Sequence, residues 1–180
     1  MVIWLTGLSG SGKSTLAAAL CAAMEDREVR LVRLDGDDVR ATFGNDLGHT
    51  EANRVTHIKR MQRFAKLLDN QNVDVIVSAL FSRPDLLEWN RENFSKYFEI
   101  YMKADLDFLI QRDTKGLYRK ALSGEIKDVV GVDIAWSPPV RPELIVDAAT
   151  APSAEVLAKD VMFNLAAAGF VTSGSRKSGK

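Results

Sequence analysis

The feature that most constrains this chain is a glycine-rich motif that directly follows its first apolar run. Val2–Thr6 is a continuous apolar run, as expected of a strand buried on both faces of a sheet. Residues 7–14 then read Gly-Leu-Ser-Gly-Ser-Gly-Lys-Ser, a full match to the pattern G-x-x-x-x-G-K-S. The Ala- and Leu-rich stretch Lys13–Met24 follows and is predicted to be helical. A strand, a glycine-rich turn and a helix in this order predict a loop that binds nucleoside triphosphate.

The residue types of this motif suit phosphate chemistry. Glycines let the backbone approach phosphate oxygens, and the N–H groups at a helix N-terminus point at the anion. Lys13 is expected to reach the β- and γ-phosphates, and the Ser14 hydroxyl to bind Mg²⁺. The expected cofactors are therefore ATP and Mg²⁺, and the loop residues expected to bind ATP are Gly10, Ser11, Gly12, Lys13, Ser14 and Thr15.

The rest of the chain alternates β-rich runs with helical stretches. Further strands are expected at Val29–Leu34, Val73–Val77, Tyr97–Met102 and Leu144–Val146. Further helices are expected at Glu51–Leu68 (capped by Thr50), Pro84–Phe94, Asp105–Arg112, Leu117–Leu122 and Ala154–Ala168. This alternation predicts an α/β fold with a parallel β-sheet flanked by helices, in one domain over residues 1–171.

Two stretches differ from this pattern. Residues 113–142 mix charges with Gly and Pro and have no clean period, which is more typical of a mobile lid than of core. Residues 172–180 read Thr-Ser-Gly-Ser-Arg-Lys-Ser-Gly-Lys and are predicted to be a disordered tail.

Composition excludes several classes of protein. The 180 residues carry 24 Lys and Arg against 24 Asp and Glu, so the balance predicts no binding to nucleic acid or to an anionic membrane. Cys21 is the single cysteine, which rules out an internal disulfide and a zinc site built on thiolates. No apolar run approaches the roughly 18–20 residues of a membrane span, and the N-terminus lacks a basic leader. We expect a soluble, cytoplasmic protein.

A pair of carboxylates follows the second predicted strand. Asp35 and Asp37 lie where ligands bind in an open parallel sheet, beyond the carboxyl ends of the strands. One carboxylate would serve the metal site, and the other would orient or deprotonate an attacking hydroxyl. The alternative is an ordinary turn in which an Asp caps a helix. Arg40, about one helical turn after Asp37, is a candidate for binding an anionic acceptor.

The predicted helix Glu51–Leu68 carries a cation on its apolar face. At 100° per residue, Arg54 falls within the apolar stripe and His57 at its edge. A cation on the buried side of a helix needs an anionic partner. The partner is either a phosphate of a bound substrate or an Asp in a structural salt bridge.

These features favour one class of enzyme among those with a phosphate loop. The sequence has no guanine-reading Asn-Lys-x-Asp segment, which argues against a GTPase. A short chain with a lid that excludes water fits a kinase of nucleotides or metabolites.

Several motifs in order resemble the adenylylsulfate kinase (APS kinase) family, from the N-terminus to about Asp147. The matching segments are Gly7–Thr15, Leu34-Asp35-Gly36-Asp37 with Val39-Arg40, Asp46-Leu47-Gly48, Arg54, Arg60, Arg112-Asp113 with Lys115-Gly116-Leu117-Tyr118, Gly124-Glu125-Ile126-Lys127 and Gly131-Val132-Asp133.

The resemblance implies a P-loop kinase fold, a homodimer and phosphorylation of the ribose 3′-hydroxyl of adenosine 5′-phosphosulfate by ATP, which gives PAPS. It implies that Asp37 and Lys13 are catalytic and that Asp35 and Ser14 serve Mg²⁺. It also implies that Arg40 and Arg54 bind the acceptor. Arg112 and Lys115 would belong to the lid that closes over ATP and the acceptor.

Three positions depart from the family at the acceptor site. His49 and the segment around Val129 replace the two Phe residues that sandwich the adenine in the family, and His57 replaces an Asn. Base–aromatic stacking is worth about 1–3 kcal/mol per base, so these changes affect recognition of the base. A pyrimidine nucleotide such as cytidine diphosphoramidate is therefore an alternative acceptor. The alternatives from other classes are a non-catalytic ATP-binding module and a kinase of small metabolites.

Overall fold

The fold is built on a parallel sheet between two layers of helices. The computed structural model describes residues 1–25 and 30–171, and within them five strands pair in the order β2-β3-β1-β4-β5, all parallel. The strands are β1 (Val2–Thr6), β2 (Leu31–Asp35), β3 (Asp74–Ala79), β4 (Tyr97–Lys103) and β5 (Leu144–Asp147). The predicted α/β fold is confirmed.

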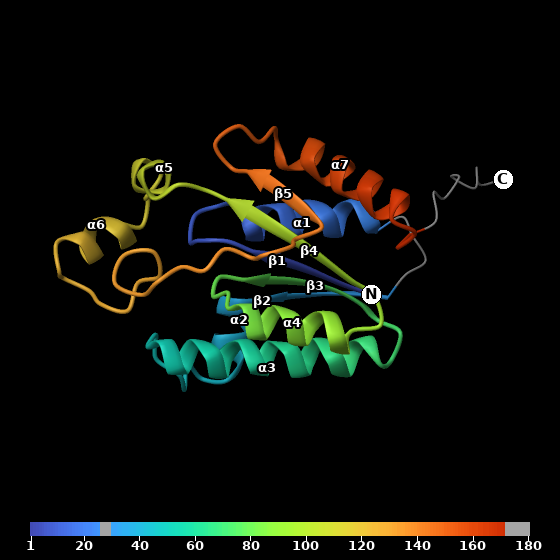
Figure 1. Cartoon of the computed structure of the whole chain (residues 1–180), viewed down its shortest axis with the longest axis horizontal. Coiled ribbons are helices and arrows are strands. Elements are labelled where there is room, and N and C mark those ends of the chain that lie inside the picture. Colours follow the sequence, from blue (N-terminus) through green and yellow to red (C-terminus); the bar gives the residue numbers. More distant parts are fainter. Residues whose placement is uncertain (26–29, 172–180) are drawn as a thin grey trace.

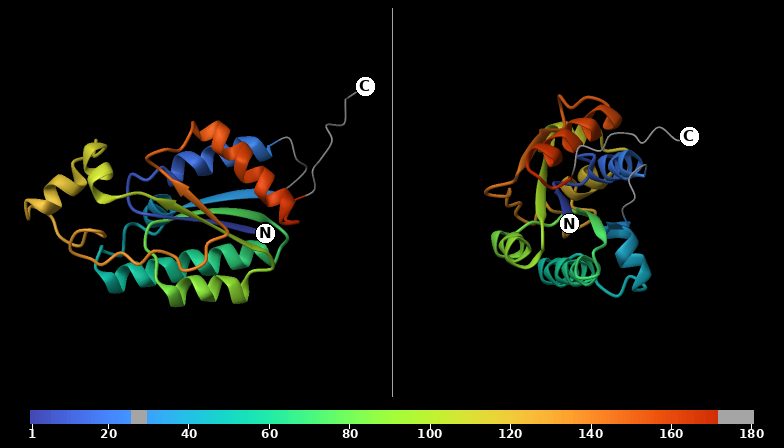
Figure 2. Two further views of the ribbon diagram at one scale, coloured as in Figure 1. Left: turned by 45° about the horizontal axis from the view of Figure 1, so that its top comes forward. Right: turned by 90° about the vertical axis from the view of Figure 1, so that its right-hand side faces the viewer.

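Helices cover both faces of this sheet. They are α1 (Lys13–Met24), α2 (Gly36–Thr42), α3 (Glu51–Asp69), α4 (Pro84–Asn93), α5 (Leu106–Gln111), α6 (Leu117–Leu122) and α7 (Ala154–Ala167). Helices α1 and α7 lie on one face, and α3 and α4 on the other (Figure 1). Figure 2 shows the same two layers from the end of the sheet. Among the described residues, none of the helices combines the length and apolar character needed to cross a bilayer.

The central strand explains why the core has two halves. Alternate side chains of β1 point to opposite faces, so Val2 and Trp4 pack with the layer of α3 and α4. Ile3 and Leu5 pack with α1 and α7 instead. All five residues of β1 are buried, as the continuous apolar run predicts.

Most of the predicted elements lie within one or two residues of the observed ones. Thr50 caps α3 through its hydroxyl, which accepts a hydrogen bond from the Asn53 N–H at 3.3 Å, as expected. The second strand begins at Leu31 and includes Asp35, whereas the predicted start at Val29 lies outside the described residues. The tail predicted at residues 172–180 also lies outside them.

The segment predicted as a lid is partly packed into the core. Helices α5 and α6 project beyond the carboxyl ends of the strands (Figure 1). Within this segment Tyr118, Val129 and Val130 are buried, against the expectation that residues 113–142 suit a flap better than core. Apolar side chains of this segment pack with Leu8 in the loop that follows β1. The composition of the segment, rich in charges, Gly and Pro, does not predict these contacts.

Candidate active site

The glycine-rich loop joins β1 to α1 at the carboxyl edge of the sheet. Gly7 has φ +151°, and a Cβ there would lie only 2.5 Å from the Met102 carbonyl oxygen, so no other residue fits. Helix α1 begins at Lys13, and its first turn has no acidic residue and no side-chain cap. The N–H groups of this helix terminus are therefore open to an anion, as the motif predicts.

Lys13 lies inside the loop and forms no ion pair with residues 1–25 or 30–171. Its Nζ donates a hydrogen bond to the Leu8 carbonyl at 2.7 Å. Burial lowers the pKa of Lys13 to about 8, although the charges of Asp35 and Asp37 oppose this change. A partly desolvated ammonium held on a carbonyl is suited to receive phosphate oxygens.

Asp35 connects the loop to the end of β2. The Ser14 hydroxyl donates to Asp35 Oδ2 at 2.6 Å, and Asp35 Oδ1 accepts the Asp37 N–H at 3.1 Å. Asp35 is thus the N-cap of α2, which confirms the capping interpretation, and its second carboxylate oxygen is the one that meets Ser14. Within residues 1–25 and 30–171, no three His, Cys, Asp or Glu side chains form a metal cage. The hydroxyl and carboxylate oxygens of Ser14 and Asp35 suit Mg²⁺, which keeps waters and phosphate oxygens as its other ligands.

Asp37 lies in the first turn of α2 and is exposed at the edge of this site. Burial lowers the pKa values of four surrounding cationic or basic groups, and the charge of Asp37 opposes that change in each. These groups are Lys13, Arg40, His49 and Arg54. The fold therefore brings the Asp37 carboxylate within electrostatic reach of the phosphate loop and of the predicted acceptor residues.

Arg40 and Arg54 present two guanidinium groups that rest on carbonyls. Arg40 is 9% exposed and donates to the carbonyls of Leu47 at 3.1 Å and Gly48 at 3.2 Å. Arg54 Nε donates to the His49 carbonyl at 2.8 Å, and its Nη2 to the Asp128 carbonyl at 2.6 Å.

Neither arginine forms an ion pair within the described part of the chain. Burial lowers the pKa values of both, and the charge of Arg40 lowers that of Arg54 further. The alternative of a structural salt bridge from Arg54 to an Asp is therefore wrong here. Two adjacent unpaired cations favour an anionic ligand.

Arg60, on the same helix as Arg54, is neutralised. It makes a two-pronged contact with Asp46 at 2.9 and 2.8 Å, and its guanidinium lies 4.0 Å from the centroid of the Phe43 ring. Because the Asp46 carboxylate already neutralises the Arg60 guanidinium, Arg60 stabilises the loop after α2 rather than binding an anionic ligand.

The two histidines differ in their surroundings. His49 is exposed, and burial together with Arg40 and Arg54 lowers its pKa. His57 is only 5% exposed, deeper than the edge position expected, and its Nε2 lies beside the backbone of Gly36. Burial, followed by the charge of Arg40, lowers the pKa of His57 to about 4. The imidazole of His57 is therefore neutral at physiological pH.

The remaining predicted residues are less closely joined to this group. Arg112 and Lys115 are exposed on the lid, and the Arg112 guanidinium lies 5.2 Å from the Phe108 ring centroid. Val129 is buried, and its N–H donates to Asp133 Oδ1 at 2.6 Å. In the loop, Ser11 is buried with an unpartnered hydroxyl, and Thr15 is exposed.

Sequence reasoning missed two residues of the lid. The Tyr118 hydroxyl donates to the Ser9 carbonyl of the phosphate loop at 2.8 Å. The Asp113 carboxylate accepts the N–H groups of Leu117, Tyr118 and Arg119. Both residues belong to the segment Arg112–Tyr118, which is among those that resemble the kinase family. The resemblance indicated that this segment has a function, but it did not predict these two contacts.

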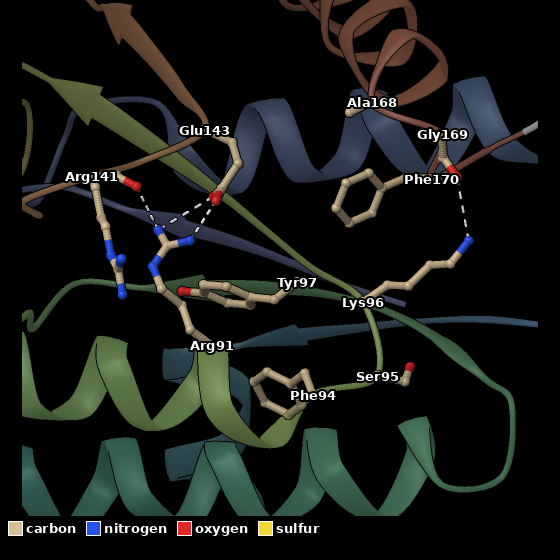
Figure 3. A pocket seen from close by; sticks show the side chains of 10 residues that line it. All are labelled: Arg91, Phe94, Ser95, Lys96, Tyr97, Arg141, Glu143, Ala168, Gly169 and Phe170. Atoms are coloured by element: carbon tan, nitrogen blue, oxygen red, sulfur yellow. Dashed lines mark hydrogen bonds and ion pairs between the residues drawn. The ribbon is translucent and has the colours of Figure 1, made fainter.

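A separate cavity of about 630 Å³ lies at the amino end of β4. Arg91, Tyr97, Arg141, Glu143 and Phe170 are among the residues that line it (Figure 3). Its guanidinium groups are paired with carboxylates of the protein, and none of the predicted site residues lines it.

Comparison with known proteins relates the chain to one family. The family model described as adenylylsulphate kinase matches residues 1–147. An adenylyl-sulfate kinase from Pseudomonas entomophila is 42% identical over 161 residues, which cover 86% of this chain and 76% of that protein. The cytidine diphosphoramidate kinase of Campylobacter jejuni is 41% identical over 138 residues, which cover 77% and 81%.

Solved structures agree with this relationship. The structure of the Mycobacterium tuberculosis APS kinase CysC in complex with AMPPNP and APS superposes with a TM-score of 0.83 at 31% identity, over 91% of this chain and 96% of that one. A longer relative, the probable bifunctional SAT/APS kinase 2 of Sorangium cellulosum, is 38% identical over 170 residues, which are 94% of this chain but only 29% of that protein.

Proposed function

This chain belongs to the adenylylsulphate kinase family, and from that premise we propose that it transfers a phosphoryl group from ATP to the ribose 3′-hydroxyl of an activated nucleotide. Adenosine 5′-phosphosulfate is the leading acceptor, and PAPS is then the product. The observation that carries the proposal is the pair Arg40 and Arg54 near Asp37, whose guanidinium groups rest on carbonyls and form no ion pair in the described part of the chain. An anionic nucleotide would satisfy both guanidinium groups at once.

Each residue has a distinct part in this proposal. The loop N–H groups and Lys13 would bind the phosphates of ATP and stabilise the charge of the transition state. Ser14 and Asp35 would hold Mg²⁺, which neutralises phosphate charge when it is bound. Asp37 would orient the acceptor hydroxyl and accept its proton, while Arg40 and Arg54 hold the phosphosulfate. Arg112 and Lys115 would approach when the lid over residues 113–142 closes.

A second acceptor is favoured by the residues that replace the aromatic sandwich. His49 is exposed and Val129 is buried, so neither position offers the phenyl ring of the family. His57 adds a neutral imidazole whose buried nitrogens lie beside Gly36 rather than facing solvent, so a contact with a base requires the side chain to turn outward. A smaller pyrimidine base tolerates the loss of the aromatic sandwich, and one relative at 41% identity carries cytidine diphosphoramidate in its name.

The decisive experiment measures acceptor-dependent ADP release with Mg·ATP. The two acceptors, adenosine 5′-phosphosulfate and cytidine diphosphoramidate, are compared at equal low concentrations. A larger kcat/KM for the adenylyl compound supports the leading proposal. Preference for the cytidine compound assigns His49, His57 and Val129 to a respecified base pocket. ATP binding without acceptor-dependent ADP release, across a broad panel, would contradict both and support the non-catalytic module.

The role of Asp37 has its own test. Asp37→Asn is expected to lower kcat by about 10²–10⁴-fold, because the amide cannot accept the hydroxyl proton. Asp38→Asn is the matched control: Asp38 is the next residue of α2, is exposed, and faces Arg33 at 3.8 Å. A rise in KM alone for Asp37→Asn would make Asp37 a binding residue.

We further propose, from the family pattern, a single kinase domain over residues 1–171, a homodimer and a cytoplasmic location. Light scattering of the full chain tests the dimer directly. A mass of 19.9 kDa in solution would contradict it.

A further inference from the structure

Tyr118 connects the lid to the phosphate loop through one partly buried hydrogen bond. Its side chain is 2% exposed, and its hydroxyl donates to the Ser9 carbonyl at 2.8 Å across 109 positions of sequence. We propose that Tyr118 is a positioning residue for phosphoryl transfer, which fixes the peptide between Ser9 and Gly10 so that the Gly10 N–H faces the phosphates. The proposal rests on the proposed function only in assigning a catalytic consequence to this geometry.

The planarity of the peptide couples the direction of the Ser9 carbonyl to that of the Gly10 N–H. In a trans peptide the carbonyl and the N–H point in opposite directions. With the Ser9 carbonyl turned toward Tyr118, the Gly10 N–H is turned away from the lid helix. Among the described residues, this N–H has no backbone acceptor. An exposed donor held in one orientation within a phosphate loop is preorganised for an anion.

Because Gly10 is flexible, the orientation of the Ser9–Gly10 peptide depends on a contact from another part of the chain. The φ of Gly10 is +79°, where glycine has wide freedom, so its own backbone does not select one orientation of the preceding peptide. The hydroxyl of Tyr118 supplies the missing restraint. Burial, and secondly the charge of Asp113, raises the pKa of Tyr118 to about 12, so the hydroxyl keeps its proton and stays a donor.

The surroundings of Tyr118 hold it firmly against the loop. The Asp113 carboxylate accepts the N–H of Tyr118 at 2.7 Å and that of Leu117 at 2.8 Å. Leu8, the neighbouring loop residue, packs in the same core cluster as Tyr118, Val129 and Val130 of the lid. The lid thus packs against Leu8 and, within the described part of the chain, reaches the loop backbone by a hydrogen bond through Tyr118.

The test is Tyr118→Phe, which removes the hydroxyl and keeps the ring that fills the core. Tyr97→Phe is the matched control, because Tyr97 is also a buried tyrosine and its hydroxyl donates to Glu99 at 2.7 Å, away from the loop. We expect Tyr118→Phe to lower kcat by about tenfold with little change in the KM of the acceptor, as for an interaction made in the transition state. Tyr97→Phe is expected to keep kcat.

A second readout does not require activity. In ¹⁵N–¹H spectra of the full chain, the Gly10 amide is expected to shift in Tyr118→Phe and to respond less to added Mg·ADP, with no such change in Tyr97→Phe. A normal Gly10 response in Tyr118→Phe overturns the proposal, whatever the effect on kcat. If no acceptor is phosphorylated, the proposed function fails, while the Gly10 comparison still decides the role of Tyr118.

Discussion

At the scale of single residues, the pairing of charges separates ligand-binding side chains from supporting ones. Arg60 has its carboxylate in Asp46, whereas Arg40 and Arg54 rest on carbonyls and repel each other. The free protein therefore holds unfavourable electrostatic energy that an anionic acceptor relieves on binding. Lys13 and His57 show the same dependence on surroundings, since burial lowers the pKa of both.

Lys13 leads to a pH-dependence of ATP binding. Its ammonium has a pKa of about 8 instead of 10.5, so the free protein loses this charge as the pH rises through about 8. The affinity for Mg·ATP is expected to be level below that pH and to fall by up to about tenfold per pH unit above it. Calorimetric titration between pH 7 and 9.5 measures this. Lys13→Arg keeps its charge over this range, so its profile is expected to stay level, and a level profile in the unmodified protein would refute the assignment.

His57 leads to a pH-dependence of stability. The unfolded chain binds a proton at His57 near pH 6.5, but the folded chain does so only near pH 4. The contribution of the neutral His57 side chain to the free energy of unfolding is therefore complete above pH 6.5. It is lost as the pH falls from 6.5 toward 4, by about 1.4 kcal/mol per unit of pKa difference. Urea unfolding at pH 7 and pH 5 measures it. His57→Gln is expected to reduce the difference in the free energy of unfolding between the two pH values. His49→Gln, the exposed control, is expected to reduce this difference less.

At the scale of elements, short helices depend on their caps. Helix α6 has six residues, too few for a stable isolated helix, and its first turn is held by three bonds to Asp113. Because Tyr118 lies in that turn, the cap also supports the contact with the phosphate loop.

Asp113→Ala is expected to loosen α6 selectively. Gly116 holds the N-cap position, and the Asp113 carboxylate accepts the first-turn N–H groups as a capping side chain does. Loss of capping bonds costs about 0.5–2 kcal/mol, so amide hydrogen exchange within Leu117–Leu122 should accelerate by about 2- to 30-fold. Helix α3 should exchange as before. The control is Asp105→Ala, since Asp105 precedes α5 but makes no side-chain cap bond. Equal acceleration in both variants would show that the cap is not the cause.

At the scale of the whole molecule, a network opposite the active site joins α4, β4 and the segment before β5. Arg91 contacts Glu99 at 3.3 Å. It also pairs with Glu143 and donates to the Arg141 carbonyl at 2.6 Å (Figure 3). Glu99 is 1% exposed, and burial raises its pKa. The segment that returns from the lid is thereby fixed to the body of the protein.

Arg91→Met is expected to lower the free energy of unfolding by about 3–5 kcal/mol, because it leaves Glu99 buried without its cation. The variant should keep kcat, since the network lies at the amino ends of the strands. Arg91→Met with Glu99→Gln should recover part of the loss. Arg141→Met is the control: its pair with Glu88 is largely exposed and is worth about 1 kcal/mol or less. Urea midpoints measure all of these, and equal losses for Arg91 and Arg141 would contradict the interpretation.

The sequence by itself determined the local elements and the phosphate loop. Val2–Thr6, Lys13–Met24 and Leu117–Leu122 have the predicted bounds, because burial pattern, glycine and caps act over a few residues. The position of Asp35 and Asp37 near the phosphate loop was also predictable, since the carboxyl ends of parallel strands share one edge of the sheet. Helix α2 was missed because it opens with Gly36, Asp37 and Asp38, residue types that are weak helix formers and indicate a turn.

The tertiary structure alone decided how these parts meet. The contact of Tyr118 with Ser9, the depth of His57 and the unpaired state of Arg54 involve residues far apart in the sequence. Arg54, for example, rests on the carbonyl of Asp128, 74 positions away. Such contacts depend on the order of strands in the sheet and on the path of the lid, which place distant residues side by side. Local propensity carries no information on that placement, because it is set by the burial of the whole core.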